Sequence, residues 1–342
     1  MPTEKSNSPF PILAITLGDP AGIGPEIVLK ALKNPVVFQQ CRPLVVGDLR
    51  ILQRAAKEIG IETGSFEVLV DPSSGTYQLN RITMIDLGNA LPDSCPVGHL
   101  SSSSGKAAVE YVLQACDLAM QGQVDAIVTA PLNKEAINLA GFHYAGHTEI
   151  LTEHTHASNV SMLLVGPNLR VVHVSTHVAL EEAIRRVSQK RVEEVIFLAQ
   201  AACIALGIGQ PRIAVAGLNP HAGENGLFGD QEAQEIMPAI LAARARGLWV
   251  TDPQPPDTVF LRAVKGEFDI VVAMYHDQGH IPMKLLGFDE GVNVSMGLPI
   301  IRTSVDHGTA FDIAGKGLAS ANSLLAAIRV ACQMVAAKKA DL

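Results

Sequence analysis

The sequence is poor in aromatic and in charged residues. Phe, Trp and Tyr make up 4% of the 342 residues, and Asp, Glu, Lys and Arg make up 18%. Hydrophobic residues reach 48%, so the interior has to be built mainly from Ala, Val, Ile and Leu. Apolar content this high is typical of α/β proteins, in which helices cover both faces of the central strands. A chain of this length accommodates two packed domains or one large one.

The cysteines are few and lack the spacing of a metal site. They are scattered, odd in number and form no Cys-x-x-Cys pair: Cys41, Cys95, Cys116, Cys203 and Cys332. A zinc–thiolate site is built from such pairs, so none is expected. We expect five reduced thiols in a cytoplasmic protein.

Basic runs and long apolar runs are also missing. The net charge is −8 and no basic cluster occurs, which argues against nucleic acid or an anionic membrane as the main partner. The amino terminus lacks the apolar core of a signal peptide, and no stretch of about 18 apolar residues could span a membrane. A small anionic substrate is still compatible with this net charge, because a few cationic side chains in one site suffice to bind it.

Short apolar runs alternate with helical segments along the chain. The first run, 11–17, leads into the Gly- and Pro-rich segment 18–26 (GDPAGIGPE), after which 27–32 is helical. Similar pairs recur up to an Ala-rich helix at 323–337. This alternation predicts right-handed βαβ units and a largely parallel sheet. No repeat or linker separates two halves, so a second domain is expected to be inserted into the first.

Three histidines follow predicted strands. They are His177 in Ser-Thr-His, His221 in Asn-Pro-His-Ala-Gly and His276 in Tyr-His-Asp-Gln. Ligands of open α/β sheets gather at the carboxyl ends of strands, and imidazole is the commonest ligand of divalent transition metals. The three are therefore candidate metal ligands, with strand capping or loop hydrogen bonds as the alternative. His173, inside the strand before His177, is expected to be structural.

Several charged residues stand out by their setting. Asp277, next to His276, is a candidate metal ligand or catalytic base, with an ordinary loop carboxylate as the alternative. Three cations lie in otherwise apolar or Gly-rich stretches: Lys134, Lys284 and Arg302. Lys and Arg are rarely placed in such settings without a partner, so an anionic ligand is indicated, although local salt bridges would explain them equally well. Lys134 and Asp277 are the candidates for catalytic proton transfer.

Two segments have the composition of phosphate- or nucleotide-contacting segments. His147 and Thr148 lie in GHTE (146–149) before a helical run, and the start of a helix binds phosphate. The alternative is an ordinary N-cap at Thr148. Residues 307–317 (HGTAFDIAGKG) combine small residues with an Asp and a Lys, which suits close approach to a nucleotide. Neither this segment nor 18–24 has the spacing of a P-loop or a dinucleotide fingerprint, so spacing alone does not name the cofactor.

From Ile12 to about Ala337 the sequence resembles the 4-hydroxythreonine-4-phosphate dehydrogenase family of vitamin B6 biosynthesis. The motifs that carry this resemblance are GDPAGIGPE (18–26), PLNKEAI (131–137), GHTE (146–149), STH (175–177), GLNPHAGENG (217–226), YHDQG (275–279) and GLPIIRTSVDHGTAFDIAGKG (297–317). The last motif is also similar to the nucleotide loop of isocitrate and isopropylmalate dehydrogenases. The resemblance implies their α/β fold, with two domains, largely parallel sheets and an active-site cleft between the domains. Residues 1–140 and 277–342 would form a discontinuous nucleotide-binding domain, and 141–276 an inserted domain for metal, substrate and dimerisation.

The resemblance also implies roles for individual residues. A divalent metal, zinc or else magnesium, cobalt or manganese, would be held by His177, His221 and His276. His276 would be offered across the interface of a homodimer with a shared active site. The substrate would be contacted by His147, Thr148, Lys284, Asn293 and Arg302. NAD or NADP would lie against His307, Gly308, Thr309, Ala310, Asp312 and Lys316.

The implied activity is metal-dependent oxidation and decarboxylation of a 4-phosphorylated four-carbon hydroxy acid. The substrate is 4-phosphooxy-L-threonine in the biosynthetic branch, and 4-phospho-D-threonate or 4-phospho-D-erythronate in a paralogous branch. The segments AGENGLFGD and YHDQGHIPMKLLGF look closer to the second branch. The alternatives are a dihydrodiol dehydrogenase of aromatic acid breakdown and a non-catalytic metabolite-binding protein on the same fold. A metal-dependent phosphotransferase is disfavoured, since a P-loop and a carboxylate-rich magnesium cluster are both missing.

Overall fold

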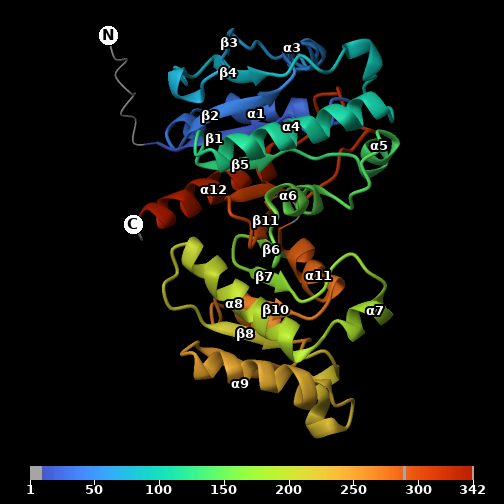
Figure 1. Ribbon diagram of the computed structural model, residues 1–342, viewed down its shortest axis with the longest axis vertical. Helices are drawn as coiled ribbons and strands as arrows, with labels where there is room; N and C mark the ends of the chain where they lie inside the picture. The colour runs from blue at the N-terminus through green and yellow to red at the C-terminus, as the bar shows by residue number, and fades with distance from the viewer. Residues whose placement is uncertain (1–9, 288–289, 341–342) are drawn as a thin grey trace. The chain divides into compact units, whose positions relative to one another are not determined.

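The chain divides into two compact units, shown in the computed structural model of Figure 1, which describes residues 10–287 and 290–340. Unit 1 comprises Met1–Ser158 and Leu298–Val335, and unit 2 comprises Asn159–Gly297 and Ala336–Leu342. Unit 2 is thus inserted into unit 1. The inserted segment is 159–297, whereas the sequence suggested 141–276. The bounds differ because helix α6 (His147–Thr155) packs against α4 (Ser102–Met120) of unit 1. At the other end, β11 (Val292–Met296) pairs with β6 (Ser161–Val165) of unit 2.

The sheet of unit 1 is parallel in every pair of the order β3-β4-β2-β1-β5-β12. Its strands are β1 (Ile12–Thr16), β2 (Arg42–Gly47), β3 (Ser65–Val68), β4 (Arg81–Asp86), β5 (Ala126–Thr129) and β12 (Arg302–Val305). Every residue of β1, β5 and β12 is buried. Because successive side chains of a strand point to opposite faces, both faces of these strands are covered.

Helices of unit 1 join or cover these strands. They are α1 (Gly24–Leu32), α2 (Pro35–Phe38), α3 (Leu49–Glu58), α4, α5 (Lys134–Leu139), α6 and α12 (Asn322–Ala340), the last running beyond residue 335. Helix α4 packs on β1, β2 and β5. Thr303 of β12 donates a hydrogen bond from its hydroxyl to the Ala327 carbonyl of α12, which ties that helix to the sheet.

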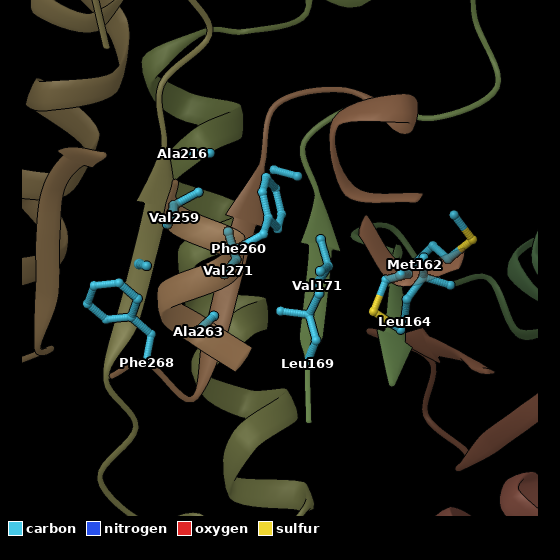
Figure 2. Packing of buried hydrophobic residues seen from close by; sticks show 13 residues of the cluster. Met162, Leu164, Leu169, Val171, Ala216, Val259, Phe260, Ala263, Phe268 and Val271 are labelled. Atoms are coloured by element: carbon cyan, nitrogen blue, oxygen red, sulfur yellow. The ribbon is translucent and has the colours of Figure 1, made fainter. Parts of the chain in front are cut away.

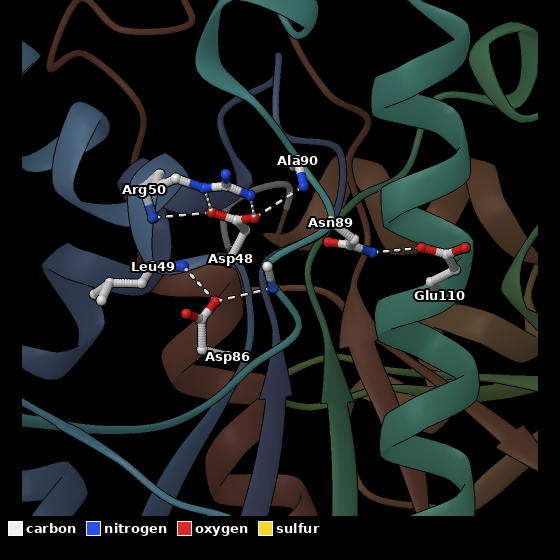
Figure 3. Close-up of polar contacts among 8 residues, drawn as sticks. Asp48, Leu49, Arg50, Asp86, Asn89, Ala90 and Glu110 are labelled. Atoms are coloured by element: carbon white, nitrogen blue, oxygen red, sulfur yellow. Dashed lines mark hydrogen bonds and ion pairs between the residues drawn. The ribbon is translucent and has the colours of Figure 1, made fainter.

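Carboxylates fix the loops that follow β2 and β4 (Figure 3). The Asp48 side chain accepts hydrogen bonds from the backbone N–H groups of Arg50 and Ala90, at 2.9 and 2.8 Å, and pairs with the Arg50 guanidinium at 2.7 Å. Asp86 accepts one from the backbone N–H of Leu49 at 3.0 Å. Asp48 thus caps α3, as a residue before a helix commonly does, and holds the next loop at the same time.

The sheet of unit 2 has the order β11-β6-β7-β10-β8-β9. The remaining strands are β7 (Arg170–His173), β8 (Ile213–Ala216), β9 (Val250–Gln254) and β10 (Ile270–Ala273). Strand β6 is antiparallel to both neighbours, and the pairs from β7 to β9 are parallel. The helices are α7 (Leu180–Arg185), α8 (Gln189–Ala205), α9 (Met237–Ala245), α10 (Val259–Val264) and α11 (His276–Gly287).

One face of the unit 2 sheet forms an apolar core with α10 (Figure 2). Val171 and Val271, on adjacent strands, pack with Phe260 and Ala263 of α10. The prediction of a largely parallel α/β protein is confirmed, and β6 is the exception. Of the described residues, no helix is both long and apolar enough to cross a membrane.

Candidate active site

The three candidate metal ligands each follow a strand of unit 2. His177 lies after β7, His221 after β8, and His276 opens α11 directly after β10. These strands are neighbours in the order β7-β10-β8 and run parallel. Their carboxyl ends therefore meet at one edge of the sheet, where α/β proteins bind ligands.

Two of the three imidazoles come together within one chain. The ring centres of His177 and His276 lie 5.6 Å apart, with the planes tilted by 46°. An ion roughly 2 Å from one nitrogen of each ring would lie roughly 3 Å from each ring centre, so this spacing suits two ligands of one metal. His221 points its ring at Phe228, 6.0 Å away. In residues 10–287 and 290–340, no group of three or more His, Cys, Asp or Glu side chains is arranged to hold a metal.

Left-handed backbone marks the loops that present His177 and His221. His177 has φ 51°, and residues 221–225 all have positive φ, from 42° to 81°. Such conformations are costly for residues other than glycine and cluster at functional sites. The buried Glu232 carboxylate supports the second loop, accepting hydrogen bonds from the backbone N–H groups of Leu218 and Asn219, both at 2.8 Å.

The nitrogen that His276 offers to a ligand is set by Asp277. The Nδ1 atom of His276 lies 2.7 Å from Oδ1 of Asp277. An ionised carboxylate only accepts hydrogen bonds, so Nδ1 carries the proton and Nε2 keeps its lone pair. A carboxylate behind a histidine in this way is a common feature of metal sites. Asp277 is 71% exposed, so its second oxygen can also meet solvent or substrate.

Sequence reasoning missed His280, which lies one helical turn after His276. Its ring centre is 3.7 Å from that of His276, and the planes are 12° apart. The ring centre of His173 lies 4.9 Å from that of His280 and 6.5 Å from that of His276. Burial, and then the charges of His276 and Lys284, lower the pKa of His280 to about 4. The i, i+4 spacing of the two histidines is the signal that could have singled it out.

In unit 1, the candidate substrate residues gather at the start of α6. The helix begins at His147 with Gly146 as its N-cap residue, so the alternative of an N-cap at Thr148 is wrong. Gly146 has an extended backbone, with φ 165°, and directly precedes the first helical residue, His147. Thr148 is therefore the second residue of the helix and lies in its first turn.

Arg302 is buried beside this helix start, and its positive charge acts on the half-buried His147. Arg302 is 2% exposed and donates from Nη2 to the Thr129 hydroxyl at 2.7 Å. Burial lowers the pKa of Arg302 to about 9, although the Glu149 carboxylate opposes the shift. Burial, and then the Arg302 charge, hold the pKa of His147 well below its usual range. The Nε2 atom of His147 is buried without a hydrogen-bond partner, so a neutral imidazole can meet a ligand there.

The other candidate substrate and catalytic residues are spread over both units. Lys284 is exposed on α11 of unit 2. Asn293, on β11 of the same unit, directs Nδ2 to the Met162 sulfur at 2.8 Å and keeps a buried Oδ1 without a partner. Lys134 is the exposed first residue of α5 in unit 1, and its ammonium group forms no ion pair with another described residue.

The candidate nucleotide segment, 307–317, follows the carboxyl end of β12 in unit 1. The segment 18–26 holds it, because the backbone N–H of Ile23 donates to the Thr309 carbonyl at 3.0 Å. A methyl group on Gly22 would lie 2.9 Å from the Cβ of Thr309, so only glycine permits this close packing. Within the segment, Lys316 donates to the Asp312 carbonyl at 2.7 Å and His307 Nδ1 lies 3.1 Å from the Gly308 carbonyl. Ala310 takes φ 41°.

Asp19, in the same glycine-rich segment, was also missed by sequence reasoning. Its side chain is fully buried, and burial raises its pKa to about 6 even though the Ala21 backbone N–H donates to Oδ1 at 2.8 Å. Its Oδ2 has no hydrogen-bond partner. A carboxylate directly after an apolar strand is the signal that could have identified it.

Comparisons with known proteins agree over nearly the whole chain. The family model described as "Pyridoxal phosphate biosynthetic protein PdxA" matches residues 39–331. The D-threonate 4-phosphate dehydrogenase of Cupriavidus necator is 50% identical over 326 residues, 95% of this chain and 97% of that protein. The crystal structure of a 4-hydroxythreonine-4-phosphate dehydrogenase from Burkholderia phymatum has a TM-score of 0.84 and 50% identity, over 96% of this chain and 99% of that one. A β-decarboxylating dehydrogenase from Thermococcus kodakarensis, with a TM-score of 0.50 and 14% identity over 92% and 81%, shares the fold alone.

Proposed function

The chain belongs to the family of the pyridoxal phosphate biosynthetic protein PdxA, and we propose that it oxidises and decarboxylates a 4-phosphorylated four-carbon hydroxy acid with NAD or NADP. D-threonate 4-phosphate, the substrate named for the relative from Cupriavidus necator, is our first choice. D-erythronate 4-phosphate and 4-phosphooxy-L-threonine follow. The observation that carries the proposal is the buried Arg302 guanidinium beside His147 at the start of α6, because a buried positive charge suits a small anionic group.

The phosphate of the substrate is proposed to bind at this helix start. Arg302 supplies a fixed positive charge, and the helix start supplies backbone N–H groups. Thr148 adds a hydroxyl, and the buried Nε2 of His147 is available to a ligand oxygen. Lys284 and Asn293 of unit 2 are proposed to contact the rest of the substrate.

We propose that His177, His221 and His276 hold the metal, zinc or else cobalt, manganese or magnesium. The donor chemistry fits, since all three side chains are imidazoles and the contact of Asp277 with Nδ1 of His276 leaves Nε2 of that ring for a metal. A bound metal would supply Lewis-acid polarisation of the substrate oxygen, and a bound nicotinamide would supply the hydride acceptor. Asp277 and Lys134 are our candidates for moving the hydroxyl proton.

The nicotinamide cofactor is proposed to lie against the segment 307–317. Gly308 offers a backbone without a side chain, and no atom lies within 4 Å of the position that a Cβ would take there. Thr309 is held in place by the segment 18–26, through the backbone N–H of Ile23. Asp312 and Lys316 are exposed, so their side chains can reach the polar groups of a dinucleotide.

A homodimer with a shared site is proposed, in a cytoplasmic protein that binds neither nucleic acid nor membrane. Helices α10 and α11 of unit 2 border an apolar groove of about 530 Å³, which extends from Tyr275 and Asp277 to Leu285. Leu285 is 82% exposed and Ile281 57%, as expected of side chains that a second subunit covers. The groove reaches Tyr275 and Asp277, on either side of His276. We propose that His276 completes the active site of the partner subunit.

A substrate panel tests this function. The protein loaded with zinc or cobalt is supplied with NAD or NADP and each of the three phosphorylated acids, an unphosphorylated analogue and an aromatic dihydrodiol. Absorbance of the reduced nicotinamide and the mass of the product are followed. We expect turnover and loss of CO2 with one phosphorylated acid. Turnover of the dihydrodiol alone would indicate the aromatic-acid branch, and binding without turnover would indicate a metabolite-binding protein.

A further inference from the structure

Two histidine rings stack at the start of α11, and a third packs beside them. The ring centres of His280 and His276 are 3.7 Å apart, and His173 lies 4.9 Å from His280 and 6.5 Å from His276. His173 belongs to β7 and is 1% exposed, and His280 is buried as well. A methyl group on Gly279 would lie 2.3 Å from Nε2 of His173, so the first turn of the helix rests directly on that ring. The stack therefore has a rigid base in the sheet.

The geometry of the stack excludes His280 as a second ligand of the metal proposed at His276. A metal lies close to the plane of each imidazole that binds it. The planes of His276 and His280 are 12° apart with their centres 3.7 Å from each other, so they do not meet within the length of a coordination bond. In addition, Nδ1 of His280 lies 3.1 Å from the His276 carbonyl, which it can reach as a hydrogen-bond donor.

Two contacts fix the His276 ring from different directions. The carboxylate of Asp277 determines which nitrogen carries the proton, because it binds Nδ1. The flat face of His280 restricts rotation of the His276 ring out of its plane, and the buried ring of His173 packs beside His280. A ligand that is held in place before the metal arrives loses less freedom on binding it.

We propose that His280 is a positioning residue, which holds the imidazole of His276 in the plane required for metal binding. The inference rests on the proposed role of His276 as a ligand. It predicts that the flat ring at position 280, more than its nitrogen atoms, supports metal affinity.

Cobalt(II) binding to the full-length protein tests this inference. The affinity for cobalt is measured by competition with a chelator, and the visible spectrum reports the geometry of the bound ion. His280→Leu removes the flat ring, whereas His280→Phe keeps a ring without nitrogen. The matched control is His154→Leu, on α6 of unit 1, which removes an imidazole that also lies 2.7 Å from an aspartate, Asp117 of α4. Circular dichroism checks that each variant is folded, and His280→Ala replaces His280→Leu if the latter does not fold.

We expect His280→Leu to weaken cobalt binding by about 10- to 100-fold, the usual effect of losing a residue that orients a ligand, and to change the spectrum. His280→Phe and His154→Leu should both stay close to the parent protein. Parent-like binding by His280→Leu, or equal losses in the Leu and Phe variants, would overturn the inference. His276→Ala separates this result from the larger proposal, because a variant at that position with unchanged cobalt binding would overturn the ligand assignment and the inference together.

Discussion

Replacing Thr148 by Val tests the phosphate site with a small change in shape. Thr148 is the second residue of α6, and Gly146 provides the N-cap. Val and Thr have similar helix propensities, so the free energy of unfolding should change by less than about 0.5 kcal/mol. A hydrogen bond to a charged phosphate is worth about 1.5–3 kcal/mol. Its loss should lower kcat/KM for the phosphorylated substrate by about 10- to 100-fold.

The assay compares kcat/KM for the phosphorylated acid and for its unphosphorylated analogue, which should be a poor substrate of the parent protein. The analogue should be little affected by the substitution, and metal content should not change. Thr155→Val is the matched control, because Thr155 lies on the same helix and donates its hydroxyl to the Leu151 carbonyl at 2.7 Å, far from the helix start. Equal losses on both substrates, or an equal loss in the control, would refute a phosphate contact by Thr148.

Three further outcomes are expected. Mixing inactive His177→Ala and His276→Ala chains should restore roughly a quarter of parental turnover. Half of the dimers would then be heterodimers, and each heterodimer would contain one intact site of two. No recovery after verified subunit exchange would mean that both residues act within one chain. The raised pKa of Asp19, about 6 against a usual 3.8, stabilises the folded state below pH 3.8, and this contribution is lost as the pH rises through 6. In urea unfolding, the free energy of unfolding of Asp19→Asn should therefore gain about 2 kcal/mol relative to the parent between pH 4 and pH 7, and parallel curves would exclude Asp19 as the source. Gly22→Ala should raise the KM for NAD or NADP with unchanged metal content, since the new methyl group meets Thr309; an unchanged KM would argue against a nucleotide at 307–317.

The class of fold was predictable because the strands at the centre of unit 1 are apolar. Strand β1 is Ile-Leu-Ala-Ile-Thr and β5 is Ala-Ile-Val-Thr. Strand β12 was not predicted, since its sequence Arg-Thr-Ser-Val is mostly polar although all four residues are buried. Arg302 bonds to Thr129 and Thr303 to an α12 carbonyl. These partners come from distant parts of the chain, which is why local sequence does not indicate burial.

The site was predictable where it depends on strand ends. Parallel strands bring their carboxyl ends to one edge, so the positions of His177, His221 and His276 at that edge follow from the topology. Which rings meet depends on side-chain packing that periodicity does not encode. The stack on His276 was missed because Gly279 and Pro282 interrupt the helical pattern of α11, and no helix was expected there.

Backbone strain in unit 2 is concentrated in the loops that present candidate ligands. A left-handed conformation costs roughly 1–2 kcal/mol for each residue other than glycine, and the segment 221–225 contains four such residues. The fold tolerates the segment because Glu232 satisfies two backbone N–H groups at its base and accepts a further hydrogen bond from the Asn219 side chain at 2.9 Å. The buried Glu232 carboxylate therefore holds the loop in one strained conformation. Such a conformation would fix the position of the His221 imidazole.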